Sequence, residues 1–291
     1  ACGHDVHTTC LLGAAKVLNT LKDDFEGTIK LIFQPGEELL PGGASLMIKE
    51  GVLENPKVDK IVALHVFPSM DVGRVGFRPG QYMAACDELY LTVKGKGGHA
   101  ALPHQYNNPV MIIAELLPKL ESYLKSLSDG KSPYVFAFGK MLADGATNVI
   151  PQKVTADGTL RTMDEKWRNE VHEKLERFVA DFLKSKNAQG QLRIAKGYPS
   201  LINDENLTRQ SMQSAVDYLG FENVEEMDVR MTAEDFSFYS QKIPACFFRL
   251  GVRNEDLGIV YGVHHPKFDI DKNALKTGAG MMAHLALRAL D

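Results

Sequence analysis

An apolar run that ends in two adjacent carboxylates is the feature that most constrains this chain. Ile29 to Phe33 reads as a buried strand, and Pro35-Gly36-Glu37-Glu38 follows it at once. Two neighbouring carboxylates repel each other unless a cation or a proton makes their states different. A metal site does this by ligating one carboxylate and leaving the other free as a base. The pair therefore predicts a site for hydrolysis at a metal.

A second apolar run ends in a histidine. Asp59 to His65 is typical of a fully buried parallel strand that delivers one polar side chain at its carboxyl end. Between the two runs, Gly42 to Gly51 has a short helical pattern closed by a glycine. Strand, helix and strand then form one right-handed crossover. Because sites in open α/β sheets lie at the carboxyl ends of strands, we expect the two glutamates and the histidine to share one sheet edge.

Cysteine and histidine supply further donors near both ends of the chain. Cys2 and His4 lie at the start of a predicted helix from Asp5 to Leu21, where the helix dipole favours a thiolate. Near the other end, Val263-His264-His265-Pro266 supplies an imidazole in a loop pinned by proline. A thiolate, imidazoles and one carboxylate suit zinc or a neighbouring transition metal, whereas calcium and magnesium prefer oxygen alone.

These stretches resemble the motifs of the metal-dependent N-acyl-amino-acid amidohydrolases. That family includes hippurate hydrolase, the indole-acetyl-amino-acid hydrolases of plants, N-acetyl-diaminopimelate deacetylase and aminoacylase relatives. Each motif alone is a weak signal, but together they keep the family's order and span nearly the whole chain. The matching stretches are Ala1–His7, Gln34–Glu38, Ala63–His65, Gly95–Pro103, Asn148–Pro151, Gly158–Arg161, Met231–Phe236 and His264–Pro266.

The resemblance implies an activity and a set of metal ligands. Members of the family cleave the amide bond of N-acyl amino acids to a carboxylic acid and a free amino acid, using two divalent ions of zinc, manganese or nickel per chain. Glu37 would be the general base and acid. The implied ligands are Cys2, which would bridge both ions, with His4, Glu38, His65 and His264.

The resemblance also assigns roles to residues far from this cluster in the sequence. His99, in a glycine-rich turn, would help to hold the oxyanion, often in the partner subunit's site. Asn148 and Arg161 would bind the free carboxylate of the substrate, since an arginine fork matches a carboxylate bidentately. A homodimer is implied.

Several of these residues also have ordinary structural readings. Cys2 could be a small buried apolar side chain, and His65 a hydrogen-bonded core histidine. His7 shares a helix face with His4 and is a fallback ligand, while His265 would support its neighbour. Glu234 and Asp235 could cap a helix beginning near Phe236, and they are also candidates for supporting the metal ligands without binding the ions.

The order of predicted elements indicates two domains. From about Met83, strand, helix, strand, strand, helix and strand follow one another, the order of a ferredoxin-like unit. We therefore expect a catalytic α/β domain with a mostly parallel sheet over residues 1–82 and 197–291, and an inserted α+β dimerisation or lid domain over residues 83–196. An edge strand of the inserted domain would pair with a second copy.

Composition excludes several other classes. The chain has 291 residues and a net charge of -4 without a basic stripe, so nucleic acid and anionic membrane surfaces are unexpected partners. No apolar run reaches the roughly 18 residues of a membrane span. Four cysteines in a chain of this length do not form a disulfide framework, which favours a cytoplasmic protein.

Three alternative functions use the same residues. A dipeptidase of the same architecture would require a free amino group on its substrate. A cysteine hydrolase with Cys2 as nucleophile and His4 as base is disfavoured, because residues two apart before a helix rarely reach that geometry. The resemblance also implies a further amino-terminal stretch ahead of Cys2, so we expect a truncated chain. A truncated, non-catalytic dimerising homologue is the third alternative.

Overall fold

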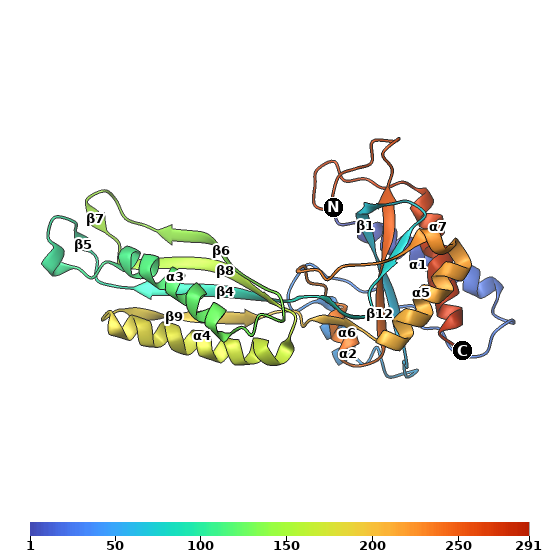
Figure 1. Cartoon of the computed structure of the whole chain (residues 1–291), viewed down its shortest axis with the longest axis horizontal. Coiled ribbons are helices and arrows are strands. Elements are labelled where there is room, and N and C mark those ends of the chain that lie inside the picture. The colour runs from blue at the N-terminus through green and yellow to red at the C-terminus, as the bar shows by residue number, and fades with distance from the viewer. Residues whose placement is uncertain (291) are drawn as a thin grey trace. The chain divides into compact units, whose positions relative to one another are not determined.

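The computed structural model describes residues 1–290, which form two compact units (Figure 1). Unit 1 comprises Ala1–Tyr82, Leu201–Arg230 and Glu234–Asp291, and unit 2 comprises Met83–Ser200 with the short segment Met231–Ala233. The chain therefore leaves unit 1 for the long segment 83–200 and again for the three residues 231–233. Over residues 1–290, no helix has the length and apolar character that crossing a membrane requires.

Unit 1 is built on a four-stranded, mostly parallel sheet with the strand order β1-β12-β2-β11. β1 and β12 are parallel, as are β2 and β11, and the central pair β12 and β2 is antiparallel. The strands are β1 (Ile61–Asp71), β2 (Val75–Phe77), β11 (Val224–Glu226) and β12 (Ala245–Arg253). The other elements are α1 (His4–Thr20), α2 (Gly43–Lys49), β3 (Gly80–Met83), β10 (Leu201–Asn203), α5 (Glu205–Leu219), η2 (Phe221–Asn223), α6 (Ser237–Ser240) and α7 (Asn273–Arg288).

The two faces of this sheet have different environments. Leu64 and Val66 of β1 belong to a buried cluster with Phe248 and Leu250 of β12 and with side chains of α1, α5 and α7. Because successive side chains of a strand point to opposite faces, the residues between them lie on the other face. The helix-covered face thus forms the core, and the opposite face is left to His65 and its neighbours.

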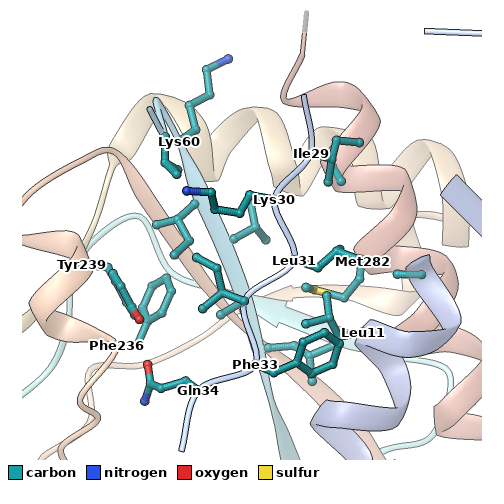
Figure 2. Close-up of a pocket in the computed structure, with 18 of the residues that line it drawn as sticks. Leu11, Ile29, Lys30, Leu31, Phe33, Gln34, Lys60, Phe236, Tyr239 and Met282 are labelled. Carbon is teal, nitrogen blue, oxygen red and sulfur yellow. The ribbon is translucent and has the colours of Figure 1, made fainter. Parts of the chain in front are cut away.

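The predicted crossover that begins with a strand at Ile29–Phe33 is wrong. Residues 28–36 form no ladder with any strand of the described chain, and Figure 2 shows Lys30, Leu31 and Phe33 along this unpaired segment. The lining of a cavity of about 550 Å³ includes Thr28–Gln34 and Pro56–His65. An apolar run specifies burial, whereas strand pairing needs a neighbouring backbone at about 4.8 Å, which depends on tertiary structure.

The predicted end of the next strand is also wrong. β1 begins at Ile61 and continues past His65 to Asp71. Its register to β12 runs without a break from Ile61 to Phe67. The imidazole therefore projects from the middle of a paired strand, where its backbone is fixed by hydrogen bonds on the β12 side.

Unit 2 is an antiparallel four-stranded sheet with two helices packed on it. The strand order is β6-β8-β4-β9. Leu116 and Leu120 of one helix and Leu175 and Val179 of the other belong to the same fully buried cluster. Its elements are β4 (Ala85–Lys94), β5 (Gly98–His99), η1 (Pro103–Gln105), α3 (Pro109–Leu127), β6 (Tyr134–Ala143), β7 (Val149–Ile150), β8 (Lys153–Thr162), α4 (Glu165–Ser185) and β9 (Gln189–Lys196).

A buried ionic cluster ties α4 to β4 in this unit. The guanidinium of Arg168 is fully buried and donates two hydrogen bonds to the Asp87 carboxylate, from Nε at 2.9 Å and from Nη2 at 2.5 Å. His172 lies 2.6 Å from the same carboxylate, and the Gly197 N–H donates to it at 3.0 Å. A buried charge is tolerated only with such partners, so this cluster is part of the core of unit 2.

Candidate metal centre

A thiol, imidazoles and carboxylates from four distant parts of the sequence converge in unit 1. Their potential ligand atoms lie within 4.8 Å of one another in overlapping groups over the described residues. The groups are Cys2 with His4 and His65, Cys2 with Glu38 and His264, and His4 with Glu37 and Glu38. All five predicted metal ligands and the predicted base are therefore brought together.

Two residues with left-handed backbone conformations, Gly3 and His264, determine where Cys2 and His264 lie. Gly3, at φ 86°, is the N-cap of α1, and a Cβ there would lie 2.7 Å from Val66 Cγ2, so only glycine fits between Cys2 and the helix. His264 has φ 64°, and its N–H donates to the carbonyl oxygen of Ala1 at 2.7 Å. This hydrogen bond holds the loop of His264 against the segment that carries Cys2.

The ring of His65 is oriented by its own strand. Its Nδ1–H donates to the Val66 carbonyl oxygen at 2.8 Å, which leaves Nε2 unprotonated in the neutral ring, 3.5 Å from Cys2 Sγ. Burial, His7 and Arg249 lower the pKa of His65 well below its usual value. A neutral imidazole with a fixed tautomer is the form that binds a metal ion.

The fallback ligand His7 has a different contact. Its Nε2 accepts a hydrogen bond from the Val66 N–H at 3.0 Å. Burial, followed by the nearby charges of His4 and Arg249, lowers the pKa of His7 to about 3. His7 therefore braces β1 against α1 in the described structure.

Acidic side chains crowd the centre and raise one another's pKa values. Glu37 and Glu38 lie 3.7 Å and 3.8 Å from His4 Nε2. Burial, Asp235 and Glu38 raise the pKa of Glu37 to about 7, against the opposing charge of Arg249. Burial and the neighbouring carboxylates, Glu38 first, raise the pKa of Cys2 to about 11. The thiolate therefore needs a cation beside it, and the set of sulfur, nitrogen and oxygen donors fits a transition-metal ion.

Glu234 and Asp235 do not cap α6 with their side chains, which was the alternative structural reading. The Asp235 carboxylate accepts from Gln34 Nε2 at 2.7 Å and from the Ala44 N–H at 3.0 Å, so it fixes the first turn of α2 and the segment before Glu37. Burial, followed by Glu37 and Asp235, raises the pKa of Glu234 well above its usual value. The residue that precedes α6 as N-cap is Phe236.

The remaining predicted site residues belong to unit 2. His99 pairs with Val149 across β5 and β7, and the Ala100 N–H donates to the Asn148 carbonyl oxygen at 3.0 Å, so His99 and Asn148 are close neighbours. Arg161 is near the other end of the sheet, where its Nε donates to Thr159 Oγ1 at 3.1 Å. Lys153 and Arg161 are eight positions apart on β8, or roughly 26 Å at about 3.3 Å per residue. Asn148 and Arg161 of one chain therefore lie toward opposite ends of β8.

One residue of unit 1 was not predicted. Arg249 is 5% exposed and lies on β12, where its Nε donates to the Tyr82 hydroxyl at 3.0 Å. Its positive charge contributes to lowering the pKa values of Glu37, His7 and His65. The signal in the sequence was an arginine inside the otherwise apolar run from Ala245 to Leu250.

Comparison with known proteins gives one consistent family. The sequence model described as Peptidase family M20/M25/M40 matches residues 1–288. An IAA-amino acid hydrolase, ILR1-like 4 of Arabidopsis thaliana, is 35% identical over 100% of this chain and 66% of its own length. An N-acetyl-L-cysteine deacetylase of Bacillus subtilis (strain 168) is 33% identical over 100% of this chain and 68% of its own length.

A solved structure agrees with these sequence matches. The crystal structure of Bacillus subtilis YxeP, described as a dinuclear metal-binding peptidase of the M20 family, superposes with a TM-score of 0.81 at 28% identity, covering 99% of this chain and 72% of that one. The chain thus spans between about two thirds and three quarters of the lengths of these three proteins.

Proposed function

The chain belongs to peptidase family M20/M25/M40, whose relatives are hydrolases, and from this premise we propose that it cleaves the amide bond of N-acyl amino acids at two divalent metal ions. The convergence of Cys2, His4, Glu38, His65 and His264 carries the proposal. The products would be a carboxylic acid and a free amino acid. The names of the plant hydrolase and the deacetylase support an amide substrate of this kind.

Five side chains would hold the ions. The thiolate of Cys2 would hold them together with His4, Glu38, His65 and His264. Zinc, manganese or nickel fits this donor set. When bound, the ions would supply an activated water and polarise the amide carbonyl.

Glu37 is the proposed base and acid. It lies beside the ligand Glu38 and next to His4, and it is less exposed than Glu38. A carboxylate in this position can take a proton from water and deliver it to the leaving amine. The charge of Arg249 helps to keep it ionised, because Arg249 opposes the effect of burial on the pKa of Glu37.

Among the residues of unit 2, we propose that His99 and Asn148 take part in the reaction. The imidazole of His99 is exposed, and its Nδ1 accepts from the Ala101 N–H at 3.1 Å, which leaves Nε2 to donate to an oxyanion. Arg161 is a separate candidate for a substrate carboxylate. We further propose that unit 2 is a ferredoxin-like domain spanning residues 83–196 through which a cytoplasmic homodimer forms.

Metal content and substrate class test this function together. The purified protein is loaded with Zn²⁺, Mn²⁺ or Ni²⁺, its metal per chain is measured by mass spectrometry, and release of amino acid is followed on a panel of N-acetyl and N-benzoyl L-amino acids. Free dipeptides are the control. Two ions per chain with metal-dependent cleavage of the acylated substrates is the expected result. Preference for the dipeptides would indicate a dipeptidase, and metal binding without cleavage of either class would reject the proposed activity.

A further inference from the structure

Glu37 and Glu38 lie on a loop whose two ends meet. The loop runs from Pro35 to Gly42 and leads directly into α2. A Cβ added to Gly43, the first residue of α2, would lie 1.6 Å from the Pro35 carbonyl oxygen, so only glycine fits where the backbone closes on itself. The proposed base and one proposed metal ligand therefore share a closed loop.

One buried carboxylate joins the residues on both sides of this closure. Asp235 is fully buried; its Oδ1 accepts from Gln34 Nε2 at 2.7 Å, and its Oδ2 accepts from the Ala44 N–H at 3.0 Å. Gln34 comes immediately before the loop, and Ala44 is the second residue of α2. Burial raises the pKa of this carboxyl, and the hydrogen bonds oppose that rise because they favour the ionised form. We refer to the two hydrogen bonds as the neck of the loop.

The loop itself has little packing of its own. Its backbone hydrogen bonds join close neighbours, from the Leu39 N–H to the Gly36 carbonyl oxygen at 3.4 Å and from the Gly42 N–H to the Leu39 carbonyl oxygen at 2.8 Å. The side chains of Leu39 and Leu40 are 77% and 41% exposed, so they do not anchor the loop in the core. Its position in unit 1 therefore depends strongly on the neck.

Asp235 links this loop to the central sheet of unit 1. The next residue is Phe236, whose ring centre lies 5.3 Å from that of Phe247 on β12. β12 pairs with β1, the strand that carries His65. A carboxylate placed from the sheet thus sets where the loop lies relative to the other proposed ligands. A base displaced by about 1 Å can lose on the order of 10²-fold in rate, so this placement matters for Glu37.

We propose that Asp235 is a positioning residue: by holding the neck of the loop, it places Glu37 for proton transfer and Glu38 for metal binding. This inference rests on the proposed function and adds to it a residue that acts through the loop. Gln34 is its partner on one side of the neck, and the Ala44 N–H is its partner on the other.

Variants that break one or both hydrogen bonds test the assignment. Asp235→Ala removes both acceptors, and Gln34→Ala removes one donor. In Asp235→Asn, the amide oxygen can accept from the Ala44 N–H, and the amide nitrogen can donate to Gln34 once the Gln34 amide has turned over. Asp204→Ala is the matched control, because Asp204 accepts from the Leu207 N–H at 2.8 Å to cap α5 in the same unit.

Two measurements require no catalysis. Hydrogen exchange of residues 35–47 is followed by mass spectrometry in the metal-free protein, and the rate of metal loss to a chelator is measured after loading with Zn²⁺. We expect Asp235→Ala to speed both on the order of 10- to 100-fold, the scale of lost hydrogen bonds to a charged group and of lost support for a metal ligand. Gln34→Ala should have a smaller effect, Asp235→Asn should recover part of the loss, and Asp204→Ala should match the wild type.

Turnover at saturating Zn²⁺ separates positioning from general stability. The kcat and KM of each variant are measured on the fastest-cleaved substrate of the N-acyl panel, and its melting temperature is recorded. Asp235→Ala should lower kcat at least about 10-fold and change KM less than about threefold, because a misplaced base affects the transition state more than substrate binding. Asp235→Asn should regain part of kcat. A kcat near that of the wild type in Asp235→Ala, whatever its melting temperature, would overturn the assignment.

The variant Gln34→Ala keeps the test decisive if Asp235→Ala does not fold. Unchanged hydrogen exchange and unchanged metal loss in Gln34→Ala would then overturn the assignment. Faster exchange of residues 35–47 together with faster metal loss would support it.

The exchange and metal measurements also separate this inference from the proposed function. If the wild type cleaves no N-acyl amino acid but Asp235→Ala still speeds exchange and metal loss, the function fails and the hold of Asp235 on the metal-binding loop stands. If the wild type cleaves its substrate and Asp235→Ala leaves exchange, metal loss and kcat unchanged, the positioning role fails alone.

Discussion

His65 and Arg249 are register partners on the adjacent parallel strands β1 and β12. The pairing puts an arginine beside a proposed metal ligand, on the sheet face opposite the buried cluster formed with α1, α5 and α7. The positive charge contributes to lowering the pKa of His65 and opposes the rise in the pKa of Glu37. One β-sheet register therefore links the metal-binding and proton-transfer parts of the proposed site.

Glu37→Gln should retain metal but lose at least about 10²-fold in turnover, the scale of a lost general base. The amide keeps the size of the side chain but cannot accept the proton. Metal per chain and kcat are measured on the same preparation, with the exposed Glu26→Gln as matched control. Near-normal turnover with the metal retained would remove Glu37 from the proposed role.

Glu38→Ala should instead reduce the metal content, because it deletes an anionic ligand. Glu26→Ala is the control for loss of an exposed carboxylate elsewhere in unit 1. Metal per chain is measured by mass spectrometry after dialysis against a weak chelator. An unchanged ratio of metal to protein would show that Glu38 is not a ligand.

Cys2 should resist alkylation in the metal-loaded protein and react after chelation. Peptide mapping after iodoacetamide treatment gives the rate at each cysteine, and the partly exposed Cys86 of unit 2 serves as an internal reference. Equal labelling of Cys2 in both states would contradict its assignment as a ligand.

Because of Asp87, the folding stability of unit 2 should depend on pH in the acid range. Burial opposes its ionisation, but the hydrogen bonds from Arg168 and His172 outweigh burial and lower the pKa of Asp87 to about 2. The folded value lies below the ordinary value of about 3.9, so the stabilisation is present above about pH 4 and is lost as the pH falls toward 2.

Removing this carboxylate tests that dependence. Asp87→Asn should lower the free energy of unfolding at pH 7 by about 3–5 kcal/mol, because the buried charge of Arg168 loses its partner. The difference in unfolding free energy between the wild type and the variant should become smaller as the pH falls from 5 to 3. Urea unfolding followed by the fluorescence of Trp167, the only tryptophan and part of α4, reports on unit 2. A difference in unfolding free energy that stays constant from pH 5 to pH 3 would contradict the prediction.

Mixing two inactive chains should show whether His99 acts across subunits. In a heterodimer of His99→Ala and Glu37→Gln chains, one of the two sites draws an intact glutamate from one chain and an intact histidine from the other. Activity should therefore return after subunit exchange. Confirmed heterodimers without activity, beside an active exchanged wild type, would reject sharing between subunits.

The sequence was sufficient wherever the signal was local. Asn108 caps α3 directly before Pro109, and Asp164 caps α4, and such caps depend on neighbouring residues alone. The donor types of the candidate site were also local, since a thiol, imidazoles and paired carboxylates stand in recognisable order. Their meeting in unit 1 agrees with the resemblance to the amidohydrolases.

Tertiary structure alone decided the pairing and the surroundings of these residues. The apolar run Ile29–Phe33 resembles a strand but forms no ladder in the described chain, because a strand exists only with a neighbour to pair with. The same holds for the hydrogen bonds of Asp235 with Gln34 and Ala44, which form only because distant segments meet there. The sequence determines the chemical types of the side chains. Their distances, their burial and the resulting pKa shifts arise only when the chain folds.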